Sequence, residues 1–208
     1  MATVIAYVDG FNLYHGLRAK YQHRYLWLDL ERLVQRIRPA DHILAVRYFT
    51  ALVRDDRPAL ARQEDYLSAL TANSRGTVDV ILGRYQARRH ACRQCGATWT
   101  SYEEKETDVN IAVSLVADAA AAASGLALIV SADSDLCPAI RTARALNRAR
   151  GMIAAFPPSR SSFEIRSLIP GAFTVAAADL RNSLLPRPSP ARLARRTNGR
   201  ASGADRRS

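Results

Sequence analysis

The 208-residue sequence contains no apolar run close to the roughly 20 residues that a membrane-spanning helix needs, so we expect no membrane segment. Its three cysteines, Cys92, Cys95 and Cys137, are too few for the disulfide framework of a small secreted domain. The N-terminus has no signal-peptide layout, because a strand-like run begins within three residues. These absences argue against membrane and disulfide-rich secreted classes and predict a cytoplasmic protein.

Lysine is also scarce, since Lys20 and Lys105 are the only lysines among 30 basic residues. Arginine therefore dominates the net charge of +11. Seven arginines against one aspartate give the segment 186–208 a charge of +6, which leaves +5 for residues 1–185. The segment is rich in Pro, Ser and Gly, so we expect a disordered basic tail. Such a tail raises the affinity for polyanions such as RNA, although a purely solubilising role is the alternative.

Apolar runs of strand length alternate with helical patterns along residues 1–185, which predicts parallel βαβ units in one domain. The run 126–130 has no polar alternation, as is typical of a strand covered on both faces. Right-handed crossovers then predict an α/β fold with a doubly wound, mostly parallel sheet in a three-layer α/β/α sandwich. The expected strands are 3–8, 42–52, 77–86, 126–132, 152–157 and 172–177, and the expected helices are 11–20, 29–38, 58–74, 106–124, 135–149 and 178–184.

The segment 87–104 breaks this alternation and predicts an excursion from the sheet, either a hairpin or a knuckle. Within it, His90-x-Cys92-x-x-Cys95 has the spacing of half a tetrahedral zinc site. A complete structural site needs four ligands, so a metal-free loop is the alternative. Arginines interleaved with Tyr85 and Trp99 favour contact with single-stranded RNA, while a solvated surface is the alternative. These arginines are Arg84, Arg88, Arg89 and Arg93.

Polar side chains occupy three places where an α/β sheet presents them at one edge. Asp9 and Asn12 follow the apolar run 4–8, and Ser131, Asp133 and Asp135 follow the run 126–130. Acids that follow parallel strands lie at the carboxyl edge of the sheet, where α/β proteins bind ligands. Each acid alone could be a helix cap. Together they predict a divalent cation site, since clustered carboxylates repel one another without a cation.

The third place is the start of the helix expected from residue 106, where Lys105 and Asp108 stand. Asp108 lies four residues before Ala112, which begins an apolar stripe continuing through Leu115 and Val116. A carboxylate on a buried face needs partners, and a cation is one that suits it. The alternative is an Asp stabilised by the helix dipole. Lys105 either holds a phosphate or is an exposed residue at the helix start.

The order Asp9-x-x-Asn12, Lys105-x-x-Asp108 and Ser131-x-Asp133-x-Asp135 resembles the NYN domain family, in its bacterial LabA-like branch. The resemblance covers about residues 3–183 and implies a PIN-like nuclease fold with an acidic cleft that binds Mg²⁺ or Mn²⁺ and cleaves RNA. It implies that four acids are metal ligands or metal-positioning residues, namely Asp9, Asp108, Asp133 and Asp135. It also implies that Asn12, Lys105 and Ser131 are supporting polar residues.

We therefore expect a metal-dependent ribonuclease that hydrolyses phosphodiester bonds in single-stranded RNA. One alternative is a non-catalytic RNA-binding or regulatory module with the same fold. Another is a phosphatase or nucleotide hydrolase, which is disfavoured because no Gly-rich phosphate loop follows the first strand. Self-association through a face of the sheet is common in α/β proteins, so a homo-oligomer is compatible with the sequence, although no residue requires it.

Overall fold

The computed structural model of the chain describes residues 1–74 and 76–186, so the expected basic tail lies, apart from Pro186, outside the described residues. Within them, the central sheet has six parallel strands in the order β3-β2-β1-β6-β7-β8. The strands are β1 (Thr3–Asp9), β2 (His42–Thr50), β3 (Val78–Leu82), β6 (Leu126–Val130), β7 (Gly151–Phe156) and β8 (Phe173–Thr174).

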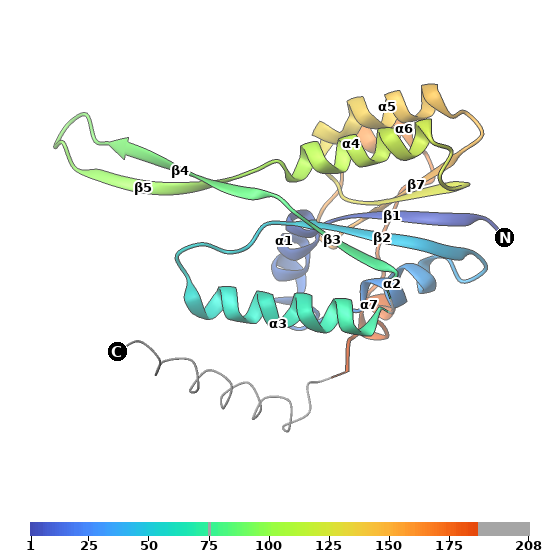
Figure 1. Ribbon diagram of the computed structural model, residues 1–208, viewed down its shortest axis with the longest axis horizontal. Helices are drawn as coiled ribbons and strands as arrows, with labels where there is room; N and C mark the ends of the chain where they lie inside the picture. Colours follow the sequence, from blue (N-terminus) through green and yellow to red (C-terminus); the bar gives the residue numbers. More distant parts are fainter. Residues whose placement is uncertain (75, 187–208) are drawn as a thin grey trace, which may run out of the picture.

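Helices cover both faces of this sheet, and Figure 1 shows the three layers. One face carries α1 (Gly10–Tyr21), α2 (Leu30–Ile37), α3 (Arg57–Asn73) and α7 (Ala177–Arg181). The other carries α4 (Thr107–Ala120), α5 (Cys137–Leu146) and α6 (Phe163–Leu168). Two apolar cores separate the layers because β-strand side chains alternate between faces. In β1, Val4, Ala6 and Val8 enter one core, and Ile5 and Tyr7 the other. The three-layer, mostly parallel α/β fold is thereby confirmed.

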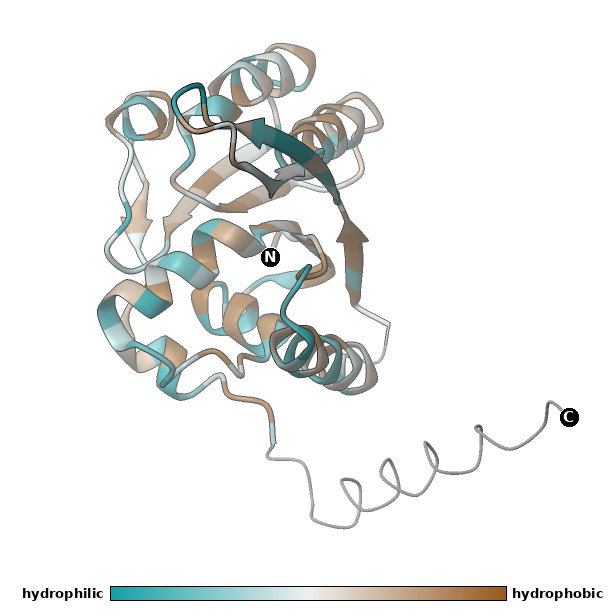
Figure 2. Ribbon diagram, turned by 90° about the vertical axis from the view of Figure 1, so that its left-hand side faces the viewer, coloured by the Kyte–Doolittle hydropathy of each residue, from teal (hydrophilic) through white to brown (hydrophobic). Residues whose placement is uncertain are grey.

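The excursion is a two-stranded antiparallel hairpin formed by β4 (Arg84–Ala91) and β5 (Thr98–Lys105). The expected single strand 77–86 is therefore wrong, since β3 ends at Leu82 and β4 begins after Gly83. The physical reason is composition, because β4 is mostly polar and has little to bury in a sheet. Figure 1 shows the hairpin projecting beyond the sheet, and Figure 2 shows the polar character of β4 against the apolar strands.

Other helix and strand ends differ from those expected from the sequence, for local reasons. The helix expected to reach residue 124 ends at Ala120, after which Ala122 adopts a left-handed conformation. The helix expected at 135–149 begins as the 3₁₀ turn η1 (Ser134–Leu136) and continues as the shorter α5. The strand expected at 172–177 contributes two residues, and α6 was not expected. None of the described helices is long and apolar enough to cross a membrane.

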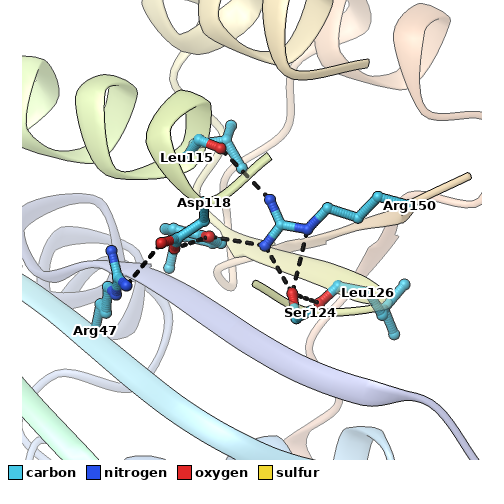
Figure 3. A network of polar contacts seen from close by, with 7 residues as sticks. Arg47, Leu115, Asp118, Ser124, Leu126 and Arg150 are labelled. Carbon is cyan, nitrogen blue, oxygen red and sulfur yellow. Dashed lines mark hydrogen bonds and ion pairs between the residues drawn. The ribbon is translucent and has the colours of Figure 1, made fainter. Parts of the chain in front are cut away.

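A buried polar network ties the sheet to α4 (Figure 3). Asp118 of α4 accepts hydrogen bonds from Tyr7 of β1 at 2.5 Å and from Arg47 of β2 at 2.8 Å. Arg150, 4% exposed, donates to the Tyr7 hydroxyl at 2.8 Å and to Ser124 at 2.8 Å. Because buried charges are costly without partners, this network holds β1, β2, α4 and the residue before β7 in one arrangement.

Candidate metal centre

The strand order of the sheet reverses between β1 and β6. The chain passes from β1 outward through β2 to β3 and then returns to β6 on the other side of β1. Ligands of open α/β sheets bind outside the carboxyl ends of the strands at such a reversal. Asp9 ends β1, and Ser131 follows the last residue of β6, Val130, which pairs with Val8. These residues therefore meet at the switch point.

Asp9 is held in place by its own helix. Its carboxylate accepts a hydrogen bond from the Asn12 backbone N–H at 2.9 Å and so caps α1. Gly10 follows because a Cβ there would lie 2.6 Å from the Phe49 carbonyl oxygen and 3.0 Å from the Tyr48 ring. The absence of that Cβ allows α1 to begin directly against β2, with Asp9, 3% exposed, at the junction.

Ser131 and Asn12 join the ends of β1 and β6. The Ser131 hydroxyl donates to the Asp9 carboxylate at 2.8 Å and accepts from the Asp133 N–H at 3.0 Å. The Asn12 side-chain oxygen accepts from the Ala132 N–H at 3.1 Å. Both supporting residues thus lie beside the acids, and they fix the position of Asp133 relative to Asp9.

Three carboxylates converge at this point. Asp9, Asp108 and Asp133 each offer one oxygen, and these oxygens all lie within 4.8 Å of one another. Asp108 reaches the group from the first turn of α4, and both Asp108 and Asp133 are half-buried. Among the described residues, Asp135 is not a member of the group. It is exposed, and its backbone N–H donates to Asp133 at 3.0 Å.

Asp108 lies at the N-terminal end of the apolar stripe of α4, and the start of the helix sets how it reaches the site. The stripe expected from Ala112 faces the core, since Leu115 is buried and Ala112 and Val116 pack half-buried against the same cluster. The buried face also includes Thr107 and Ile111. The helix start has no side-chain cap, and Glu106 before it adopts a left-handed conformation with φ 79°. This conformation turns the chain from β5 into α4, so that Asp108 lies at the edge of the buried face.

The electrostatics of the cluster favour a cation. Burial raises the pKa of Asp9 above its ordinary value, and the charge of Asp133 raises it further, while the bonds from Asn12 and Ser131 act in the opposite direction. The donor set is entirely carboxylate oxygen, which suits hard cations such as Mg²⁺ and Mn²⁺. Opposite oxygens around Mg²⁺ lie about 4.2 Å apart, twice the metal–oxygen distance, so small side-chain movements suffice for joint ligation.

The model of the NYN domain matches residues 3–168, which is most of the chain. The chain belongs to the NYN domain family. Its nuclease-like fold and Asp cluster agree with that membership.

Two further comparisons describe the relatives of this NYN domain. It is 28% identical over 180 residues to 6-hydroxy-3-succinoylpyridine 3-monooxygenase HspA of Pseudomonas putida, a match that covers 67% of this chain and 54% of that protein. The chain thus spans about half the length of that curated relative. A crystal structure of a protein of unknown function from Vibrio parahaemolyticus, VPA0982, is similar in fold, with a TM-score of 0.57 and 18% identity. That match covers 88% of this chain and 96% of the other.

Two aromatic residues that the sequence did not single out, Tyr48 and Phe11, lie next to the acidic site of the NYN domain. Tyr48 lies against Gly10, and burial raises its pKa to about 12, while its bond to Thr50 lowers it and the Asp9 charge raises it. Phe11 meets Tyr85 edge to face, with ring centroids 6.4 Å apart. This contact anchors the base of the hairpin beside α1. Tyr48 gave no recognisable signal, because a buried strand tyrosine is usual in a core.

The hairpin of the NYN domain has two different faces, because paired residues on neighbouring strands share a face. One face carries the pairs Arg84–Lys105, Arg88–Ser101 and His90–Trp99. The other includes the pairs Ala87–Tyr102 and Arg89–Thr100. Lys105 is exposed at the base of the hairpin, three residues before Asp108, and Arg84 forms an ion pair with Glu106. The expected arginine patch is therefore split between the two faces, and Arg93 lies in the tip loop.

The Cys/His segment occupies the tip of the hairpin. His90 stacks on Trp99 with ring planes 13° apart, and its Nε2 lies 2.7 Å from the Ser101 hydroxyl. Across the described part of the chain, His90, Cys92 and Cys95 form no group of three potential metal ligands. One copy of the chain thus does not bring these three residues together around an ion.

Proposed function

We propose that this NYN domain is a metal-dependent ribonuclease that uses Mg²⁺ or Mn²⁺. The observation that carries the proposal is the convergence of the Asp9, Asp108 and Asp133 carboxylates at the switch point of an NYN fold. A divalent cation held there lowers the pKa of water and compensates charge on phosphate oxygens, which is what phosphodiester hydrolysis requires.

The chain's own residues would supply positioning and charge. Ser131 and Asn12 orient Asp9 and Asp133 through the bonds described above, which keeps the acids in place before a substrate arrives. Asp135 orders the turn that bears Asp133, since its N–H donates to that carboxylate, and acts as an outer acid of the site. Lys105, at the base of the hairpin, is suited to attract the phosphate of the bond to be cleaved.

The hairpin would bind the RNA strand. Its Arg84 face combines positive charge with Trp99, which is 54% exposed although it stacks on His90. Exposed aromatic rings bind unpaired bases by stacking, and arginines bind the phosphates, so this surface favours single-stranded RNA. The face begins at Arg84 and Lys105, next to the start of α4, and leads from the tip toward the acidic site.

The first test is cleavage of labelled single-stranded RNA in Mn²⁺ or EDTA. We expect Asp108→Asn to lower cleavage by at least about 100-fold, the order seen when a group that stabilises transition-state charge is removed. The matched control is Asp79→Asn, which removes the same charge from an exposed position of β3 and should leave cleavage unchanged. Cleavage by Asp108→Asn at the wild-type rate would contradict the proposed site.

The alternative of a non-catalytic RNA-binding module makes a different prediction. Such a module binds RNA equally well in EDTA and cleaves none in Mn²⁺, with either variant. A phosphatase or nucleotide hydrolase would turn over mononucleotides when these replace RNA under the same conditions. The monooxygenase name belongs to the Pseudomonas relative, of which the match covers 54%, and it supports no separate proposal for this chain.

A further inference from the structure

The hairpin tip has the local geometry of a metal-binding turn. The last strand pair is Ala91–Thr98, and the Cys92 N–H donates to the Ala97 carbonyl at 2.8 Å. The Gly96 N–H donates to the Cys92 carbonyl at 2.9 Å, and Gly96 adopts φ 70°, which glycine tolerates best. The turn is thus closed by backbone bonds, and the two cysteines stand three positions apart within it.

Backbone N–H groups of this turn favour the thiolate form of Cys92. The backbone N–H groups of Cys95 and Gln94 lower the pKa of the Cys92 thiol, and the Cys95 side chain acts in the same direction. Donors directed at sulfur favour the thiolate, which is the form that binds metal. Cys92 is half-buried and Cys95 exposed, so both sulfurs lie at the surface of the tip.

One tip provides half of a tetrahedral site. A structural zinc ion requires four ligands, and Cys92 and Cys95 supply two. His90 is engaged with Trp99 and Ser101, and no third ligand from the described residues completes a group with the cysteines. The strands of the hairpin pack chiefly against each other, and the tip lies at the end of a projecting arm that another molecule can approach (Figure 1).

We propose that two copies of this chain join at their hairpin tips around one Zn²⁺ ion, with Cys92 and Cys95 of each copy as the four ligands. Two identical tips related by a twofold axis satisfy a four-ligand site, because each contributes the same pair. The charge also balances. A Zn²⁺ ion with four thiolates carries −2, and the exposed Arg93, which lies between the cysteines in each copy, supplies +2 in total.

The test combines zinc content with molecular mass, measured on the full chain under reducing conditions. With Zn²⁺ we expect one zinc per two chains and twice the 22.9 kDa mass of one chain, and a chelator should return the monomer. Co²⁺ substitution should give the intense sulfur-to-metal charge-transfer absorption of a tetrathiolate site. The double variant C92S/C95S should lose the metal and the dimer together.

Two controls separate this site from the acidic one. Cys137→Ala removes the buried thiol of α5 and should leave zinc binding and dimerisation unchanged. Asp108→Asn should also leave both unchanged, since the acidic site lies at the opposite end of the hairpin. One zinc per monomer, no bound zinc, or a dimer that persists in C92S/C95S would each overturn the proposal. None of these outcomes would bear on RNA cleavage.

Discussion

At the acidic site, the buried charge of Asp9 lowers the stability of the folded protein. Asp9 is buried beside Asp133, and its hydrogen bonds from Asn12 and Ser131 do not fully offset the desolvation of its charge. A buried carboxylate retained at such a cost is typical of a site prepared for a partner of opposite charge. Stability should therefore be lowest where the cluster is fully charged and holds no cation.

The raised pKa of Asp9 predicts how stability depends on pH in EDTA. The folded-state pKa of Asp9 lies above its ordinary value of 3.8, so the folded protein binds the proton more tightly than the unfolded chain. The free energy of unfolding should then fall as the pH rises from about 3.8 through the raised value. Asp9→Asn resembles the protonated form, so its thermal midpoint should fall less than that of the wild type as the pH rises above 3.8.

The comparison requires a control and a metal titration. Asp79→Asn, on the exposed surface of β3, should keep the wild-type pH dependence. Mn²⁺ should raise the thermal midpoint of the wild type and not that of Asp9→Asn, because a ligand that binds the folded state stabilises it. An unchanged pH dependence in Asp9→Asn would show that the charge of Asp9 is not the destabilising group.

Among the elements, the β4–β5 hairpin departs most from the rest of the sheet. It contributes little to either apolar core, and its residues alternate between a basic, aromatic face with Arg84, Arg88 and Trp99 and a second face with Arg89 and Tyr102. Because these strands bury few side chains, core packing does not fix their surface residues. The two faces provide an internal comparison, because Arg88 and Arg89 carry the same charge on opposite sides.

If RNA follows the Arg84 face, Arg88→Ala should weaken RNA binding and Arg89→Ala should not. Loss of one phosphate contact should lower the slope of log affinity against log salt by about 0.7 for a single strand. Binding is measured in the Asp108→Asn background, so that cleavage does not intervene. Equal losses in both variants would mean that the hairpin acts only through its overall charge.

The whole molecule is held together by contacts between distant parts of the chain. The network around Asp118 joins β1, β2, α4 and the residue before β7, on the face of the sheet opposite α1 (Figure 3). Asp118 is the one carboxylate shown there among the guanidinium groups of Arg47 and Arg150. It pairs directly with Arg47 and is linked to Arg150 through the Tyr7 hydroxyl.

Removal of that charge should destabilise the entire fold. Asp118→Asn keeps the size of the side chain but removes the anion that pairs with Arg47 and is linked through Tyr7 to Arg150. We expect a loss of about 3–5 kcal/mol in the free energy of unfolding. Tyr7→Phe removes one hydroxyl and should cost about 1–3 kcal/mol. Urea denaturation measures both, and a smaller loss for Asp118→Asn than for Tyr7→Phe would contradict this account.

The sequence by itself determined the layers of the fold and the sheet edge that bears the acids. Apolar runs such as 126–130 mark buried strands, and residues at or just after a strand end, such as Asp9 and Asp133, lie at its carboxyl edge. These are local properties of hydrophobic pattern and chain connectivity. They also placed Asn12 and Ser131 near the acids.

Only the tertiary structure decided which acids meet and where the excursion goes. Asp108 joins Asp9 from a position 99 residues away, because the left-handed Glu106 and the buried face of α4 set its approach, whereas Asp135 stays outside the group. The hairpin separates at Gly83 because β4 lacks apolar side chains to bury, and His90 turns to Trp99 and not to the cysteines. Such choices depend on packing between distant segments, which local pattern does not encode.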